Sequence, residues 1–407
     1  VRLQTVLSVA ASGGPSDGAA SRPVQTNLGI VIDKSGSMNG ARMTRAKQAA
    51  SELVESLPSH VTFMVVAFDS QAQAIVPPGP ANETNKRAAL YAISKIEADG
   101  GTAMSRGLNL VGMGFKGAPG ATVTLLLTDG KNESESRHEL NGVLQAFAAA
   151  KMPVHARGIG DGWVVEELRH IASSTGGTAD AAPELEEMDA MLSEIATVAS
   201  KIAFDDVRLR LQTFLGGQVV KVQQAFPEFA DKQLRPVSER IVEIPMGALA
   251  DGQSFDFLVE IDLAAKAAEE EALILRPSLL YRAGSGEEVE LKAPREHWVV
   301  AQWSGNTSKT AQIHPKVASV TNQEKLSQLV EDGMKALETG DKSKATALLG
   351  EAEVQAKKVG NTVLLDSLAK VIQRDASGTA RLTGSVGAQN TLRLRSGKTA
   401  RLQGGES

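Results

Sequence analysis

The residues best suited to chemistry in this 407-residue chain follow a short apolar run at residues 29–32. One carboxylate and two hydroxyl groups come directly after it, from Asp33, Ser35 and Ser37. A short apolar run bounded by Gly is typical of a strand buried on both faces of a parallel sheet, and ligand sites in such sheets lie beyond the carboxyl ends of the strands. Hard oxygen donors of this kind suit Mg²⁺, Mn²⁺ or Ca²⁺.

Two further segments carry residue types that such a site needs. Gly100 and Gly101 precede Thr102, and a second apolar run, residues 125–128, leads into Asp129. One interpretation is that all these residues are only loop caps and turn formers, because Asp and Ser favour such positions. Together, however, the three segments resemble the metal-ion-dependent adhesion site of von Willebrand factor type A (VWA) domains, in the order of that family and with suitable spacing.

The resemblance implies one divalent ion and the residues that hold it. The ion is expected to be Mg²⁺, with Mn²⁺ or Ca²⁺ as alternatives. In the family pattern, the two serines bind directly through their hydroxyls, the threonine and the second aspartate bind directly or through water, and the first aspartate binds through water or orients the others. The metal ligands implied here are Asp33, Ser35, Ser37, Thr102 and Asp129. The resemblance also implies a partner protein that presents an Asp or Glu carboxylate to the ion.

These residues need a sheet to position them, and residues 24–202 have the pattern that would build one. Strand-like and helical segments alternate there, which predicts an α/β fold with a doubly wound, mainly parallel, Rossmann-like sheet and helices on both faces. The resemblance to VWA domains covers the whole span. The predicted strands are 31–33, 61–68, 123–128 and 154–159, and the predicted helices are 41–57, 85–97, 104–115, 135–150, 163–174 and 184–202.

The flanking segments predict a second domain that is split by the first. Residues 1–10 alternate between apolar and polar as a half-buried strand does, and a Gly/Ser/Pro-rich linker follows them. Residues 203–315 contain short β-like runs separated by Gly, Pro and Asp. We therefore predict an antiparallel β-sandwich built from 1–23 and 203–315, with the VWA domain (24–202) inserted. Bacterial multidomain proteins that resemble this one often show that arrangement.

The C-terminal part of the chain reads as helices and then a tail. Residues 316–376 show helical apolar patterns and predict a helical module, with Thr321 and Glu324 as a capping box. Residues 377–407 contain five basic residues and one acidic residue with little apolar clustering, and this composition predicts a flexible basic tail. Three of its threonines lie near an arginine, and we hypothesise that they are phosphorylated. They are Thr379, Thr391 and Thr399.

The amino-acid composition excludes some kinds of chemistry and argues against others. The chain is 42% hydrophobic and 22% charged, enough for several apolar cores, and its lack of cysteine excludes disulfides and cysteine nucleophiles. No apolar run approaches the ~20 residues that cross a bilayer. The formal net charge of −5 argues against general nucleic-acid binding. We expect a cytoplasmic protein, with export as the alternative because the chain begins with Val1 and a signal peptide could have been removed.

The predicted function is a non-enzymatic protein–protein interaction module. The six histidines are scattered without ligand spacing, and the sequence has no P-loop, no Gly-x-Ser-x-Gly motif and no dinucleotide fingerprint. Two alternatives stay open. One is a metal-stabilised scaffold that binds partners through the sandwich, the helices or the tail, and the other is a metal-dependent hydrolase.

Overall fold

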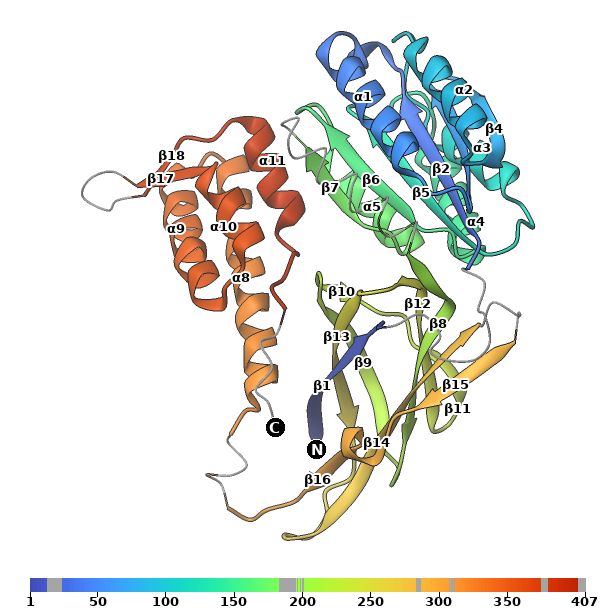
Figure 1. Ribbon diagram of the computed structural model, residues 1–407. Coiled ribbons are helices and arrows are strands. Elements are labelled where there is room, and N and C mark those ends of the chain that lie inside the picture. Colours follow the sequence, from blue (N-terminus) through green and yellow to red (C-terminus); the bar gives the residue numbers. More distant parts are fainter. Residues whose placement is uncertain are drawn as a thin grey trace.

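The computed structural model describes residues 1–12, 24–182, 195, 197, 199, 201–282, 287–306, 308, 312–374 and 380–401. These residues form an α/β domain, a two-sheet β-sandwich and a helical module (Figure 1). The predicted helix over 184–202 lies largely outside the described residues.

The α/β domain contains a six-stranded sheet with the order β4-β3-β2-β5-β6-β7. Its strands are β2 (Thr26–Asp33), β3 (Val61–Phe68), β4 (Ala72–Pro80), β5 (Ala121–Thr128), β6 (Val154–Ile159) and β7 (Ala179–Ala182). Strand β4 runs antiparallel to β3, and the other neighbours are parallel, which confirms the predicted mainly parallel sheet. The sequence prediction missed β4, whose prolines suit only an edge position, and the short β7.

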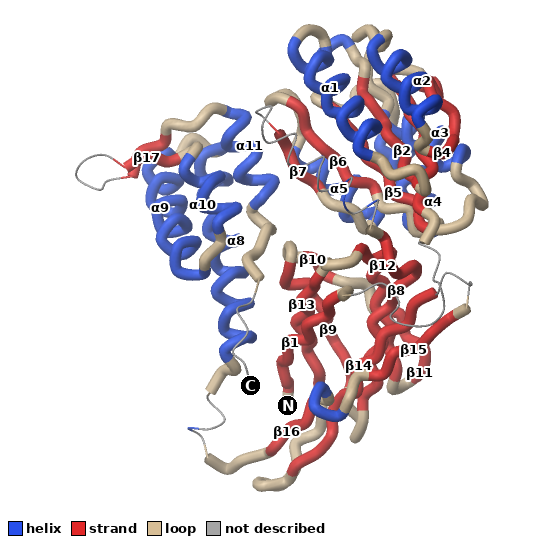
Figure 2. Tube along the Cα trace, viewed as in Figure 1, coloured by secondary structure: helices blue, strands red, loops and turns tan. Residues whose placement is uncertain are grey.

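Helices cover both faces of this sheet (Figures 1 and 2). Helices α1 (Ala41–Ser56) and α2 (Glu83–Ser94) pack on one face, against Ile30 and Ile32 of β2. Helices α3 (Met104–Gly114), α4 (Arg137–Ala149) and α5 (Val165–Thr175) pack on the other face. Gly29 lets α3 approach closely, because a Cβ there would lie 2.4 Å from Cγ1 of Val111. Both faces of β2 are therefore buried, and Asp33 is left at the edge of the sheet where the strand ends.

The β-sandwich contains the N-terminal strand. Strand β1 (Arg2–Ala10) pairs antiparallel with β13 (Ser254–Asp262), which confirms the predicted pairing across the inserted domain. The two sheets have the orders β1-β13-β9-β10 and β11-β12-β8-β14-β15, and β16 pairs with β14. Val9, Leu209 and Val259 meet in the core between them. The other strands are β8 (Ile202–Thr213), β9 (Gln218–Phe226), β10 (Ala230–Asp231), β11 (Arg235–Ser238), β12 (Ile241–Ala250), β14 (Glu271–Arg282), β15 (Glu288–Lys292) and β16 (Val299–Gln302).

The first helix of the helical module, α8 (Pro315–Glu338), begins before the predicted capping box. His314 caps α8 and Pro315 is its first residue, so Thr321 lies inside the helix and its hydroxyl donates to the carbonyl of Val317. The predicted capping box is therefore wrong. The first turns of α8 pack on the sandwich through Val317 and Val320. The elements are α8 (Pro315–Glu338), α9 (Lys342–Val359), α10 (Thr362–Ala369), β17 (Ile372–Arg374), β18 (Ala380–Leu382) and α11 (Val386–Arg395).

The prediction of a flexible tail is wrong for residues 380–401. Helix α11 lies between the helical module and the α/β domain, on the side of α8 that faces β7 and α5 (Figure 1). Leu392 packs into the core of the helical module and Leu394 into the core of the α/β domain. Two leucines on one short helix thus join two domains, a contact that no local sequence pattern reveals.

Ion pairs explain why this basic segment is ordered. Nε of Arg395 donates to Asp180 of β7 at 2.7 Å, and Nζ of Lys398 lies 3.5 Å from a carboxylate oxygen of Glu228 in the sandwich. The positive charges that suggested an exposed tail are matched by acids of the other two domains.

Two of the threonines proposed as phosphorylation sites are buried. Thr391 and Thr399 are 2% and 8% exposed. Their hydroxyls donate to the carbonyls of Gly387 and Ala225, at 2.9 and 2.6 Å. The folded protein does not offer either hydroxyl to a kinase, so the phosphorylation hypothesis is wrong for both. Thr379 lies outside the described residues.

Candidate metal centre

The carboxyl ends of β2 and β5 lie side by side because these strands are parallel neighbours (Figure 1). Ile32 pairs with Leu127, so Asp33 and Thr128 follow at adjacent positions of the sheet edge. After β2 the chain turns into a short 3₁₀ helix, η1 (Gly36–Met38), and then into α1. The sheet therefore brings together two acids, Asp33 and Asp129, that are far apart in the sequence.

Asp33 is fully buried, and both its carboxylate oxygens accept hydrogen bonds. Oδ2 accepts from the Thr128 hydroxyl at 2.5 Å, and Oδ1 accepts from the backbone N–H of Ser35 at 2.8 Å. Burial raises the pKa of Asp33 to about 6; the two hydrogen bonds oppose this rise, and the nearby charge of Asp129 adds to it. Asp33 thus orients the loop that follows it, and a cation nearby would favour its charged form.

Ser35, Ser37 and Asp129 form a chain of polar contacts. The hydroxyl oxygens of Ser35 and Ser37 lie 3.1 Å apart, and the Ser37 hydroxyl donates to Oδ1 of Asp129 at 2.8 Å. Ser35 and Asp129 are buried, whereas Ser37 is exposed. The site therefore opens to solvent on the side of Ser37.

The second loop is tied to the first and the third by its backbone. The backbone N–H of Gly36 donates to the carbonyl of Gly100 at 2.9 Å. The N–H of Thr102 donates to Oγ of Ser134 at 3.0 Å, and the N–H of Ser134 donates back to the carbonyl of Thr102 at 2.9 Å. Thr102 is buried, so these bonds fix it beside the sheet edge.

Gly130 shows that oxygens from all parts of the site converge. A Cβ added to Gly130 would lie 3.2 Å from Oγ1 of Thr102, 3.5 Å from Oγ of Ser37 and 3.6 Å from Oδ2 of Asp33. The absence of a side chain at Gly130 leaves that space free. The structure therefore brings all five sequence-predicted ligands, which come from three loops, to one place.

The donor set fits a hard divalent ion. Every candidate donor is an oxygen, and two carboxylates balance the charge of such an ion. The described part of the chain holds no cluster of three or more His, Cys, Asp or Glu side chains that could bind a metal. A site of this kind would depend on hydroxyls for its remaining donors, as the positions of Ser35, Ser37 and Thr102 allow.

Sequence reasoning missed two residues that contact the site. Thr128 donates to Asp33, and Arg42 donates from Nη1 to Oδ2 of Asp129 at 2.8 Å and from Nη2 to Oδ1 of Asp161 at 2.7 Å. The only signal for Arg42 was a cation in the first turn of the helix after the serine loop. Its two carboxylate partners come from distant loops, so their proximity is a property of the fold.

Two histidines of the domain, His155 and His170, contact side chains away from the site. A ring nitrogen of His155 lies 2.8 Å from the hydroxyl oxygen of Thr178, and one of His170 lies 2.6 Å from Oδ1 of Asn141. Burial lowers the pKa of His155 to about 3, and the charges of Arg157 and Lys398 act in the same direction, so this histidine stays neutral at physiological pH.

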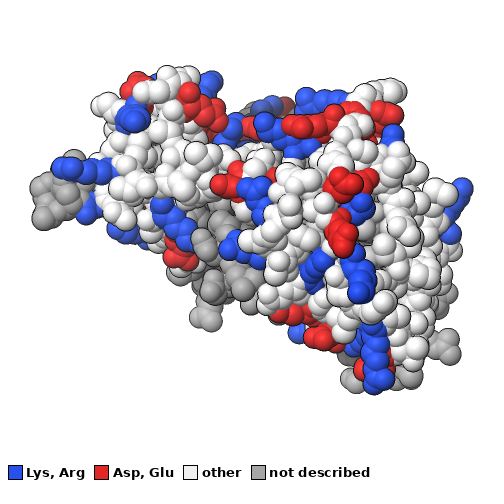
Figure 3. Space-filling view, turned by 90° about the horizontal axis from the view of Figure 1, so that it is seen from above, with Lys and Arg blue, Asp and Glu red and all other residues white. Residues whose placement is uncertain are grey.

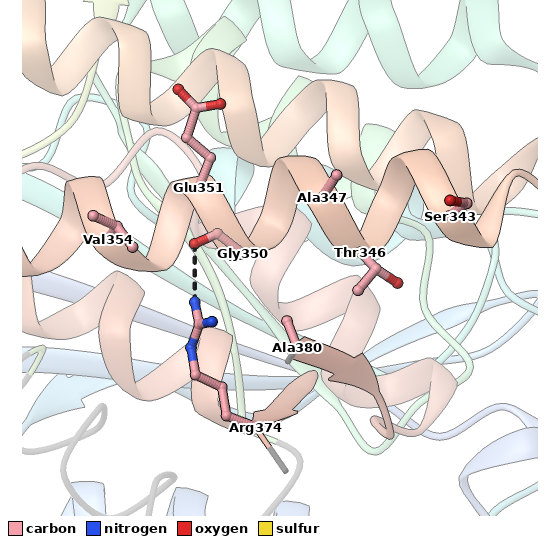
Figure 4. Close-up of a pocket in the computed structure, with 8 residues that line it drawn as sticks. All are labelled: Ser343, Thr346, Ala347, Gly350, Glu351, Val354, Arg374 and Ala380. Carbon is pink, nitrogen blue, oxygen red and sulfur yellow. Dashed lines mark hydrogen bonds between the residues drawn. The ribbon is translucent and has the colours of Figure 1, made fainter. Parts of the chain in front are cut away.

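An open depression of about 630 Å³ lies in the helical module, on α9 beside β17 and β18 (Figure 4). Nη2 of Arg374 donates to the carbonyl of Gly350 at its wall, at 3.3 Å. The residues around it are mostly small or aliphatic, and the five candidate ligands are not among them. Its chemistry is therefore separate from that of the sheet edge.

The distribution of charged side chains on the surface is consistent with the formal net charge of −5. On the face seen in Figure 3, basic and acidic side chains alternate over both the α/β domain and the helical module. Among the described residues, we find no helix with the length and apolar character needed to span a bilayer.

Comparison with known proteins identifies the α/β domain. A family model of the von Willebrand factor type A domain matches residues 26–181. The chain therefore contains a VWA domain. An uncharacterised protein of Synechocystis sp. is 33% identical over 177 residues, which are 43% of this chain and 41% of that protein. The inter-alpha-trypsin inhibitor heavy chain H4 of Bos taurus is 30% identical over 127 residues, or 29% of this chain and 14% of that one. The chain thus spans less than half of the length of these curated relatives.

Solved structures extend the likeness beyond the VWA domain. A von Willebrand factor type A protein from Catenulispora acidiphila is 27% identical with a TM-score of 0.86, and the match covers 98% of this chain and 93% of that one. The sandwich and the helical module are therefore part of the shared architecture. The ArnB paralog VWA2 of Sulfolobus acidocaldarius shares the fold, with a TM-score of 0.53 and 14% identity over 99% of this chain and 100% of that one. VWA domains commonly mediate protein interactions and often bind a divalent metal.

Proposed function

We propose that this protein binds one divalent ion through Asp33, Ser35, Ser37, Thr102 and Asp129, and that it uses the ion to capture an acidic side chain of a partner protein. The observation that carries the proposal is the convergence of these side chains from three loops around Gly130. Mg²⁺ is the proposed ion, with Mn²⁺ or Ca²⁺ as alternatives, because all the donors are hard oxygens.

A divalent ion held there would supply an electrophilic position that accepts a carboxylate from the partner. The residues of the chain provide the rest of the site. Thr128 and the backbone of Ser35 hold Asp33, which orients the serine loop. The exposed Ser37 marks the side from which the partner approaches, since the other ligands are buried beside the sheet.

We propose further that the site does not catalyse a reaction. Metal-assisted hydrolysis needs a general base or a second metal beside the first. The ionisable groups in the hydrogen-bond network of the site are Asp33, Asp129, Arg42 and Asp161, and Arg42 already engages both Asp129 and Asp161. His155 and His170 bond to other elements. These contacts favour a binding role over hydrolysis.

Calorimetry tests the ion site. We would titrate Mg²⁺ and Mn²⁺ into EDTA-treated wild type, Ser35→Ala and Ser56→Ala. Ser56 is a matched control because its hydroxyl donates to the carbonyl of Leu53 at the end of α1, away from the site. We expect wild type and Ser56→Ala to bind one ion alike, and Ser35→Ala to bind at least about tenfold more weakly. Equal binding by Ser35→Ala would refute the assignment.

Affinity capture from the native cells, in Mg²⁺ and in EDTA, tests the role of the ion. Loss of the partner in EDTA while the circular dichroism spectrum is unchanged supports capture through the ion. Partner binding that survives EDTA and the Ser35→Ala change supports the alternative, a scaffold that binds through the sandwich or the helical module. The capture also identifies the partner.

A further inference from the structure

Arg42 links the candidate metal centre to a second loop. It lies in the first turn of α1, directly after the serine loop. Nη1 donates to Oδ2 of Asp129 at 2.8 Å and to the carbonyl of Ser37 at 3.2 Å, and Nη2 donates to Oδ1 of Asp161 at 2.7 Å. One guanidinium thus bridges a buried ligand of the proposed ion and a carboxylate at the surface.

The loop after β6 is shaped around this guanidinium. A Cβ on Gly160 would lie 2.9 Å from Nε of Arg42, and one on Gly162 would lie 3.8 Å from its Nη1. Gly160 also has a φ of +70°, a backbone conformation that other residues adopt rarely. The loop therefore leaves space for the Arg42 side chain, and any side chain at position 160 would enter that space.

The contacts of Asp129 set up a competition between two cations. Its Oδ1 accepts from Ser37 and its Oδ2 accepts from Arg42, so both oxygens are engaged. A divalent ion that binds Asp129 must share or replace one of these donors. It must also approach the positive charge of Arg42, which opposes binding. Arg42 is 33% exposed at its side chain whereas Asp129 is 0% exposed, so the guanidinium lies at the solvent side of the carboxylate.

We propose that Arg42 is a recognition residue of this site, which both competes with the ion for Asp129 and binds the acidic side chain of the partner. This inference rests on the proposed function. In the ion-free protein, Arg42 neutralises and holds Asp129. When an ion takes Asp129, Nη1 of Arg42 loses one of its two acceptors, while the carbonyl of Ser37 still accepts from Nη1 and Asp161 still anchors Nη2. A carboxylate from the partner has two oxygens, and the guanidinium accommodates the second one.

The proposal predicts opposite effects of one substitution on two ligands. Arg42→Met keeps an unbranched apolar side chain but removes the guanidinium with its charge and donors. We expect it to raise the affinity for Mn²⁺ about tenfold, because the competing cation is gone. We expect the same variant, saturated with Mn²⁺, to bind a carboxylate at least about fivefold more weakly. If Arg42 had a purely structural role, its replacement would weaken the binding of both Mn²⁺ and the carboxylate, or of neither.

The experiment uses the full chain with Mn²⁺ alone and then with one probe. Calorimetry gives the Mn²⁺ affinity of EDTA-treated protein. The change in water-proton relaxation then gives the affinity of the Mn²⁺-loaded protein for N-acetyl-aspartate methylamide, which presents a single side-chain carboxylate. Lys47→Met is the control, since Lys47 lies on the same helix but donates to the carbonyl of Ser94. We expect it to stay within about twofold of wild type in both assays.

Arg42→Lys controls for a folding defect in Arg42→Met, because it keeps the positive charge but replaces the planar guanidinium with a single ammonium group. We expect its two affinities to lie between those of wild type and Arg42→Met. Unchanged or weaker Mn²⁺ binding by Arg42→Met overturns the competition, and unchanged probe binding overturns the recognition role. If wild type binds no Mn²⁺, or binds Mn²⁺ but not the probe, the proposed function itself fails, which distinguishes that failure from the failure of this inference.

Discussion

Replacing Asp33 by Asn tests how burial affects the first carboxylate of the site. Asp33 is fully buried, and its pKa is raised to about 6 from an ordinary value of 3.8. The folded protein therefore binds a proton at Asp33 more tightly than the unfolded chain does. Such a group contributes stability that is fully present below about pH 4 and is lost as the pH rises through about 6. Asn mimics the protonated acid at every pH, so it avoids this loss.

The size of the effect follows from the difference in pKa. A pKa higher by about two corresponds to about 3 kcal/mol in the free energy of unfolding, at 1.36 kcal/mol for each pH unit. In EDTA, we expect Asp33→Asn to be more stable than wild type by up to about 3 kcal/mol at pH 8. The difference should shrink to near zero at pH 4. Saturating Mg²⁺ should reverse the order at pH 8, because wild type gains the free energy of ion binding and the variant does not.

The assay must separate the VWA domain from the other domains, because a multidomain chain does not unfold in one step. We would unfold both proteins in urea between pH 4 and 8 and follow hydrogen exchange of peptides from β2 and β5 by mass spectrometry. Peptides from β12 and β14 of the sandwich serve as the internal control and should show no difference. A stability difference that is constant over this pH range, or an Asn variant that is less stable than wild type at pH 8 in EDTA, would refute the reasoning.

Three further substitutions test the packing around the site and the junction of the domains. Leu394→Ala should cost about 2–5 kcal/mol in the docking of α11, and hydrogen exchange in residues 386–395 should rise while β2 stays protected. Arg395→Gln removes a partner of Asp180, whose pKa burial would raise but the charges of Lys398, Arg395 and Arg157 together lower; the variant should lower the melting temperature at pH 7, and the difference should shrink only as the pH falls through this lowered pKa, below the ordinary value of 3.8. Gly158→Ala would place a Cβ 2.7 Å from the Trp163 ring, and we expect a loss of about 1–3 kcal/mol in the VWA domain, measured by urea unfolding with hydrogen exchange of peptides from β6.

The parts of the fold that were predictable from the sequence are those with a local signature. The apolar runs of β2 and β5 end at acids, and this pattern was enough to place Asp33 and Asp129 at one edge of a parallel sheet. The alternation of β1 was likewise enough to assign it to the sandwich, because a lone strand needs a partner.

What the sequence could not reveal depends on contacts between distant segments. Arg42 looked like any helix-surface cation, and only the fold brings Asp129 and Asp161 to it. Residues 380–401 looked disordered because their few leucines do not cluster locally. Leu392 and Leu394 instead enter two different cores, and the charge of the segment is matched by acids of other domains. Composition alone does not distinguish a free tail from a segment that is complementary to its own protein.

The pairing of β1 with β13 has a consequence for the order in which the chain folds during synthesis. Strand β1 leaves the ribosome long before β13 is made, and all strands of the VWA sheet are translated in between. We expect the VWA domain to fold first, while β1 remains an unpaired strand with which other chains could pair. Its polar side chains reduce that hazard. In the folded sandwich, Arg2 and Ser8 hydrogen-bond to acidic side chains of β13. An apolar strand of another chain would lack these acids and would therefore pair with β1 less favourably than β13 does.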